Sequence, residues 1–150
     1  MIHLERTLDI NAAPDAVWAM VGRFMHIDEF APQVTKVEAL TDGDDGVGST
    51  RRCHFENGDS VVEKVTEWDD GRRYRVQLSE IDNMPLHEMH AGFAIEPLAG
   101  GRSRVNQFMD FRVKYGPLGW LMGQTMMKMM MGKIMAGNLQ GLADNLPSES

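Results

Sequence analysis

The stretch at residues 116–146, GPLGWLMGQTMMKMMMGKIMAGNLQGLADNL, decides the fold that we expect for this chain. It predicts one long helix, because Pro117 suits the first helical turn and the next proline, Pro147, stands where the apolar pattern stops. Residues three or four apart share a helix face, so we expect this face to pack on a large apolar surface. The face consists of Trp120, Gln124, Met127, Met131, Met135, Leu139, Leu142 and Leu146.

Two further sides of the same helix are unusual. Leu118 begins a second apolar side that continues through Met122, Met126 and Met129, and these three methionines are candidates for contact with a second copy or another partner. The third side is formed by Gly119, Gly123, Gly137 and Gly141. Each glycine costs a helix about 1 kcal/mol relative to alanine, so these small residues should admit a neighbouring backbone or leave room for a bound molecule.

The composition predicts one globular domain at residues 1–146, with 43% hydrophobic and 25% charged residues and a short disordered tail at 147–150. A net charge of −7 argues against nucleic acid as a partner and disfavours anionic membrane surfaces. Gln124, Thr125, Lys128 and Lys133 interrupt the long helix and argue against stable membrane insertion. The single cysteine, Cys53, fits a reducing compartment, so we expect a cytoplasmic protein.

The remainder of the chain carries mostly strand patterns. Residues 2–10 alternate between apolar and polar. Two short helices are expected after them, one from Pro14 to Gly22 or Arg23 and one at His26–Phe30. Six more strands are predicted near residues 34–40, 49–56, 60–68, 73–79, 89–95 and 105–113. Antiparallel hairpins need a cover for their apolar face, and the long helix is the available cover. We therefore expect an α+β fold, a curved antiparallel sheet of about seven strands wrapped around a C-terminal helix.

Several phrases in this order resemble a known family. They are NAAPDAVW at residues 11–18, GVGSTRR at 46–52, the strand of Gly58, Val61, Val62, Glu63, Lys64 and Val65, and the terminal long helix. Together they resemble the START-related superfamily (SRPBCC, or Bet v 1-like), and within it the polyketide cyclase/dehydrase and lipid-transport branch. The resemblance implies a helix-grip fold with a deep apolar cavity between sheet and helix. Members bind lipids, sterols, hormones, quinones or polyketides, and some are enzymes.

Arg51 and Glu63 are the polar candidates for the wall of that cavity. A two-residue turn at Asn57-Gly58 would set Arg52 opposite Glu63, whereas a three-residue loop would set Cys53 opposite Glu63 with Arg51 diagonal to it. The resemblance favours the second arrangement. If both charges face inward they should pair or meet a polar ligand group, and the alternative is an exposed ion pair worth less than about 1 kcal/mol.

Other residues are weaker candidates for ligand contacts. They are Tyr74, Gln107 and Met109 on strands, Gln124, Met127 and Met131 on the helix, and Trp120 as a gate at the start of the helix. His26 and Asp28 could form an acid–base pair at the mouth, although solvated surface residues are the simpler interpretation. We expect no metal site, because His87 and His90 lie three apart on a strand and the acidic turn at residues 42–46 lacks the pattern of a calcium loop.

Two functions follow from these expectations. The first is a carrier or sensor that binds a small hydrophobic ligand such as a lipid, quinone or polyketide in a methionine-lined cavity, without a cofactor. The second is a polyketide cyclase or dehydratase that uses the same cavity and a carboxylate or histidine to move protons. The chain shows no compelling catalytic pair on inward strand positions, which favours binding.

Overall fold

The structure is a computed structural model that describes residues 1–43, 45–81 and 84–146. Seven strands form one curved antiparallel sheet. They are β1 (Ile2–Ile10), β2 (Val34–Ala39), β3 (Thr50–Phe55), β4 (Ser60–Asp69), β5 (Arg73–Ser79), β6 (Leu86–Leu98) and β7 (Arg102–Val113), and their order in the sheet is β1-β7-β6-β5-β4-β3-β2. The predicted α+β class and the strand count are confirmed. The expected disordered tail and Asp44 of the acidic turn lie outside the described residues.

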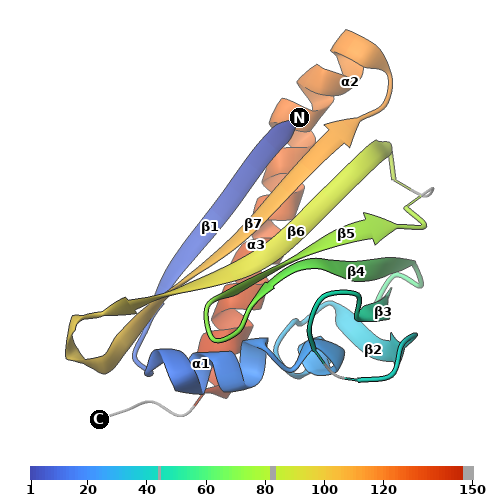
Figure 1. The fold of residues 1–150 in the computed structure, drawn as a ribbon. Helices are drawn as coiled ribbons and strands as arrows, with labels where there is room; N and C mark the ends of the chain where they lie inside the picture. The colour runs from blue at the N-terminus through green and yellow to red at the C-terminus, as the bar shows by residue number, and fades with distance from the viewer. Residues whose placement is uncertain (44, 82–83, 147–150) are drawn as a thin grey trace.

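The helices stand where the sequence predicted them. Helix α1 (Pro14–Val21) and the 3₁₀ helix η1 (Phe24–Glu29) follow β1, and a second 3₁₀ turn, η2 (Ala99–Gly101), joins β6 to β7. The long helix consists of α2 (Gly116–Met122), the π-helical turn η3 (Gly123–Met127) and α3 (Lys128–Asn145). Figure 1 shows α3 running behind the sheet and α2 extending beyond the end of β7.

The core lies between the inner face of the sheet and α3. Val65, Val105 and Phe111 of the sheet and Met135 and Leu142 of α3 have no exposed surface. Because a strand directs alternate side chains to opposite faces, the apolar residues predicted to share a face lie on the inner side of the sheet. This packing stabilises the long helix, whose many glycines make it weak by itself.

The π-helical turn changes which side of α2 is buried. A π turn inserts one extra residue, and an α-helix rotates by about 100° per residue, so the segment before η3 is turned by that angle relative to α3. Gly119 and Gly123 are therefore buried, while Trp120 is 56% exposed and Gln124 is only partly buried. The predicted helix face was wrong at Trp120 and Gln124, because it assumed uninterrupted α-helical spacing.

Two glycines of the long helix allow the close backbone approach that we expected of that side. A Cβ atom built on Gly141 would lie 2.0 Å from the carbonyl oxygen of Phe30, and one on Gly119 would lie 1.6 Å from that of Lys114. Any larger residue at either place would push the helix away from the chain segment beside it.

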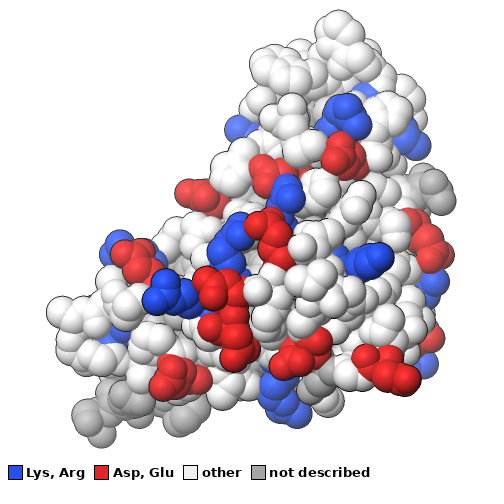
Figure 2. Space-filling model, viewed as in Figure 1, with Lys and Arg blue, Asp and Glu red and all other residues white. Residues whose placement is uncertain are grey.

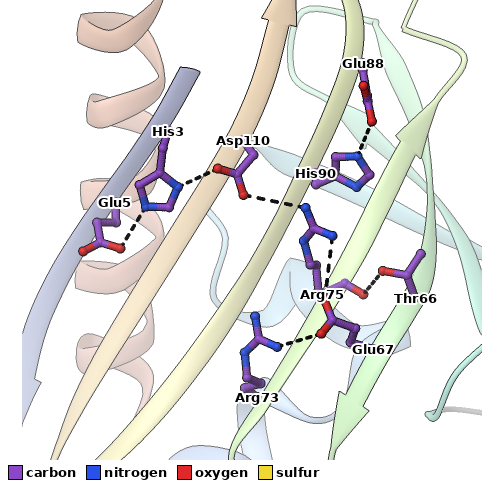
Figure 3. A network of polar contacts seen from close by, with 9 residues as sticks. All are labelled: His3, Glu5, Thr66, Glu67, Arg73, Arg75, Glu88, His90 and Asp110. Carbon is purple, nitrogen blue, oxygen red and sulfur yellow. Dashed lines mark hydrogen bonds and ion pairs between the residues drawn. The ribbon is translucent and has the colours of Figure 1, made fainter. Parts of the chain in front are cut away.

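The outer face of the sheet carries charged side chains that contact one another across neighbouring strands (Figures 2 and 3). Nδ1 of His3 lies 2.6 Å from Asp110, and Arg75 lies 3.7 Å from both Asp110 and Glu67. The hydrogen bond to Asp110, followed by that to Glu5, raises the pKa of His3. Charged residues of both signs thus face solvent on the outer side of the sheet, and the helix lies on its apolar inner side.

In the part of the chain that the structure describes, no helix is both long enough and apolar enough to span a membrane.

Candidate functional site

A cavity of about 920 Å³ lies between the inner face of the sheet and the long helix. Nine methionines belong to its lining: Met84, Met89, Met109, Met122, Met126, Met127, Met129, Met130 and Met131. Exposed lining residues mark its mouth, where Asn57 and Asp59 of the β3–β4 hairpin lie across from Met126, Met129 and Lys133 of the helix. The helix and the sheet therefore enclose a hollow that side chains do not fill.

The β3–β4 hairpin sets the polar wall of this cavity. Arg51 pairs directly with Glu63, a register that neither sequence-based alternative contained. Both alternatives were wrong because the loop consists of residues 56–58, with Gly58 at φ +90° and the side-chain oxygen of Asn57 accepting from the backbone N–H of Asp59 at 2.9 Å. Three-residue loops of this kind end in a left-handed residue, which glycine adopts without strain.

Arg51 and Glu63 form a buried ion pair in the wall. Nε of Arg51 donates to Oε1 of Glu63 at 2.8 Å, and a terminal nitrogen lies 2.7 Å from the same oxygen. The other terminal nitrogen donates to the carbonyl of Phe24, and the guanidinium carbon lies 3.9 Å from the centroid of the Phe24 ring. Burial, the largest single influence, lowers the pKa of Arg51, but Glu63, Tyr74 and Cys53 together outweigh it, so the pKa is raised. Arg51 is thus a cation fixed on three sides.

Cys53 lies beside this pair. Its thiol donates to Oε1 of Glu63 at 3.4 Å. Burial raises the pKa of Cys53 far above that of a free thiol, and the carboxylate of Glu63 raises it further. The reactive thiolate form is therefore suppressed, as expected for an inert cysteine in the interior.

Tyr74 lies in the same wall within a cluster of aromatic rings. Trp68 stacks on it at 5.5 Å between centroids, and Phe24, Phe93 and Trp18 approach it at 5.7, 5.9 and 6.3 Å. Among the described residues its buried hydroxyl has no hydrogen-bond partner within normal geometry. Burial raises the pKa of Tyr74, and the nearby charge of Arg51 partly opposes this. The hydroxyl is therefore neutral, and its ring is held rigidly.

A second polar pair joins the sheet to the helix. Asn138 of α3 donates to Oε1 of Gln107 at 3.4 Å, and both residues are buried in the lining. Gln107 pairs with Phe93 and Phe93 with Tyr74 on three adjacent strands. Because neighbouring strands are about 4.8 Å apart, the backbones of Tyr74 and Gln107 are separated by roughly 10 Å. The cavity thus presents two polar places on a mostly apolar surface.

The structure brings most of the predicted ligand-binding residues together. Arg51, Glu63, Tyr74, Gln107, Met109, Met127 and Met131 all belong to the lining, whereas Trp120 and Gln124 do not. His26 and Asp28 are also outside it, because the end of η1 turns His26 toward Glu29, 3.8 Å away. Sequence reasoning missed Asn138, although it lies seven residues after Met131 and so on the same helix face. No group of three or more His, Cys, Asp or Glu side chains in the described residues could hold a metal ion.

Comparison with known proteins agrees with this architecture. The family model described as polyketide cyclase / dehydrase and lipid transport matches residues 1–147. A sequence comparison with curated proteins found no significant match.

Three solved structures illustrate the likeness. One is the Zhui aromatase/cyclase from Streptomyces sp. R1128, with a TM-score of 0.79, 18% identity and coverage of 95% of this chain and 92% of that one. Another is the protein XoxI from Bacillus cereus, with a TM-score of 0.79, 18% identity and coverage of 97% and 96%. The third is a START superfamily protein from Mycobacterium smegmatis, with a TM-score of 0.74, 19% identity and coverage of 96% of both chains. At these identities the likeness concerns the fold.

Proposed function

This chain belongs to the polyketide cyclase / dehydrase and lipid transport family, and from that premise we propose that its cavity binds a small hydrophobic molecule such as a lipid, quinone or polyketide. The protein then acts as a carrier or sensor. One observation carries the proposal: a hollow of about 920 Å³ remains between sheet and helix. Ligand sites for small molecules are mostly apolar and measure about 300–1,000 Å³, so this hollow has the size and chemistry of one.

One part of the cavity lining consists of packed aromatic rings and another of flexible methionine side chains. This difference supports the proposal that the cavity binds hydrophobic molecules of varied shape. Tyr74 and its aromatic neighbours form a rigid wall beside Arg51 and Glu63. The mouth and the helix side are lined by methionines, whose unbranched side chains adapt to irregular surfaces. A ligand would therefore be oriented at its polar end and accommodated loosely along its apolar part. A cytoplasmic location, expected from the single cysteine, is part of the same proposal.

A polyketide cyclase is the second candidate, since a structural neighbour is an aromatase/cyclase. Such an enzyme needs a group that accepts a proton from the substrate. In the described lining there is no histidine, Cys53 and Tyr74 hold their protons, and Oε1 of Glu63 is engaged by Arg51 and Cys53, which leaves Oε2 of Glu63 as its one oxygen without a partner among the described residues. These contacts favour the carrier or sensor over the enzyme.

Filling the cavity tests the proposal. Ala91 lies in the lining and is 7% exposed, so Ala91→Phe would occupy ligand space. Ala136 is exposed on α3, and Ala136→Phe is the matched control. We expect the neutral probe N-phenyl-1-naphthylamine to bind the wild type and the control alike and to bind Ala91→Phe at least about tenfold more weakly. Native mass spectrometry of protein from cells would show a co-purified ligand. Equal probe binding by all three proteins would refute the site.

A further inference from the structure

We propose that the ligand is a neutral molecule with a hydroxyl group at its polar end, an alcohol or a phenol, and that Glu63 accepts its hydrogen bond. This inference rests on the proposed binding function. It names the chemical class that the polar wall can receive and excludes fatty acids and other carboxylates.

The charges of the lining disfavour an anionic ligand. The buried wall contains one cation, Arg51, and one carboxylate, Glu63, which already neutralise each other. The mouth of the cavity carries one further cation, Lys133, and two further carboxylates, Glu56 and Asp59. A ligand carboxylate in the interior would therefore have no uncompensated cation to pair with, and a buried unpaired charge is strongly unfavourable.

The accessible atoms of the wall offer an acceptor rather than a cationic donor. All three nitrogens of Arg51 contact protein oxygens, and its side chain is 2% exposed. The side chain of Glu63 is 13% exposed, and all its contacts with described residues are made by Oε1. Oε2 has no partner among those residues. An ionised carboxylate only accepts hydrogen bonds, so the group that matches it is an O–H donor.

Three matched probes separate this inference from the function on which it rests. They are 4-octylphenol, its methyl ether 4-octylanisole, which has no donor, and the anion 4-octylbenzoate. We expect the phenol to bind at least about tenfold more tightly than the ether, because a hydrogen bond to a charged group contributes that much, and the benzoate to bind most weakly. Displacement of the fluorescent probe measures all three.

Arg51→Met/Glu63→Leu removes both charges together, so the variant avoids an unpaired buried ion. In it the phenol and the ether should bind equally. Binding of the benzoate as tightly as the phenol, or a phenol preference that survives in the double variant, would overturn the hydroxyl inference while leaving the cavity a ligand site. Failure of all three probes to bind the wild type would overturn the binding function itself and this inference with it.

A different observation carries a second inference: we infer that α2 and the first turns of α3 dock on an anionic lipid bilayer. Large apolar side chains are exposed together here, and Figure 2 shows few charged side chains over α2. This apolar tip consists of Tyr115, Leu118, Trp120, Leu121, Met126, Met129 and Met130, each more than half exposed. Met126, Met129 and Met130 also line the cavity, so the surface is continuous with the cavity mouth.

The charge of the chain segment that carries the apolar tip identifies the partner, although Glu56 and Asp59 belong to the same cavity mouth. The chain has a net charge of −7, yet residues 111–143 contain four Lys and Arg residues and no Asp or Glu. Of these, Arg112 pairs with Glu88, while Lys114, Lys128 and Lys133 have no ion pair within the described residues. Apolar and tryptophan side chains flanked by lysines are typical of segments that lie in the interface of an anionic membrane. A two-fold dimer through the same surface would instead bring like-charged lysines toward each other.

Co-sedimentation with vesicles tests the second inference. We expect binding to vesicles of phosphatidylcholine with phosphatidylglycerol, weaker binding without phosphatidylglycerol, and release by salt. Leu118→Asp/Leu121→Asp should reduce binding at least about tenfold. Leu40→Asp/Val47→Asp adds two carboxylates at apolar residues that are 46% and 68% exposed elsewhere, and it should bind like the wild type. Absence of vesicle binding, or a dimer in analytical ultracentrifugation that the double variant dissociates, would overturn the inference.

Discussion

Replacing Tyr74 by phenylalanine should stabilise the protein without its ligand. Buried tyrosine hydroxyls usually find a partner, and their removal usually costs stability. The Tyr74 hydroxyl is buried and has no hydrogen-bond partner among the described residues, so its solvation in the unfolded chain is lost on folding without replacement. Tyr74→Phe removes this unsatisfied group and leaves the ring packing with Trp68 and Phe24 unchanged.

The expected size of the effect follows from two opposing contributions. Removing an unsatisfied buried polar group gains about 1–3 kcal/mol. Against this gain stand the lost packing contacts of one buried oxygen, about 0.1–0.2 kcal/mol each, and the lost attraction between the hydroxyl and Arg51. We expect a net gain of about 1 kcal/mol in the free energy of unfolding, which corresponds to a rise in Tm of about 3 °C for a chain of this length.

Urea unfolding followed by fluorescence measures the change, and the second tyrosine of the chain is the control. Tyr115 is 72% exposed, so Tyr115→Phe should change the free energy of unfolding by less than about 0.5 kcal/mol. A loss of 1 kcal/mol or more in Tyr74→Phe alone would mean that the hydroxyl is bonded in the native protein, and the description of the polar wall would then be wrong.

Three further predictions concern the ion pair, the π turn and the outer face of the sheet. Arg51→Met or Glu63→Leu alone should cost about 3–5 kcal/mol in urea unfolding, because each leaves a buried charge unpaired, and the double variant should recover most of it; additive losses would show that the two charges do not interact. Deletion of Thr125 should remove the extra residue of the π turn and leave the circular dichroism spectrum and a cooperative melt intact, whereas deletion of Ala136 should rotate the buried face of α3 and abolish the melt. If the two deletions behave alike, the π turn is not an insertion. The raised pKa of His3 contributes stability that is fully present below about pH 6.5 and is lost as pH rises through the folded-state pKa, so His3→Asn should destabilise the protein by a few tenths of a kcal/mol at pH 5.5 and by less at pH 8.5; a cost that grows with pH would contradict this sign.

Local patterns predicted the elements of this fold well, because period and turn chemistry are properties of neighbouring residues. The strand at Arg73–Ser79 and the strand at Ile2–Ile10 have the bounds that alternation indicated. Pro117 stands in the first turn of the long helix as expected. Alternation and the family resemblance favoured an inward Arg51, whereas for Tyr74 they left open whether its hydroxyl enters the cavity.

The errors arose where the outcome depends on one residue of register. The Asn57-Gly58 signal indicated a hairpin, but only the folded loop shows that three residues turn the chain and that Arg51 meets Glu63. In the long helix, one extra residue in the π turn moved Trp120 and Gln124 out of the buried face. Neither the length of the hairpin loop nor the extra residue of the π turn could be read from the pattern of apolar and polar residues.

The sequence by itself determined the strand and helix order and the apolar faces of the strands, since each depends on residues a few positions apart. Only the tertiary structure decided that the helix stands away from part of the sheet and leaves a cavity, because that gap depends on how glycines, aromatic rings and methionines from distant segments pack together. The oxygen of Glu63 that has no partner among the described residues and the apolar tip of α2 are likewise consequences of packing, since exposure and pairing are fixed only when the whole chain has folded.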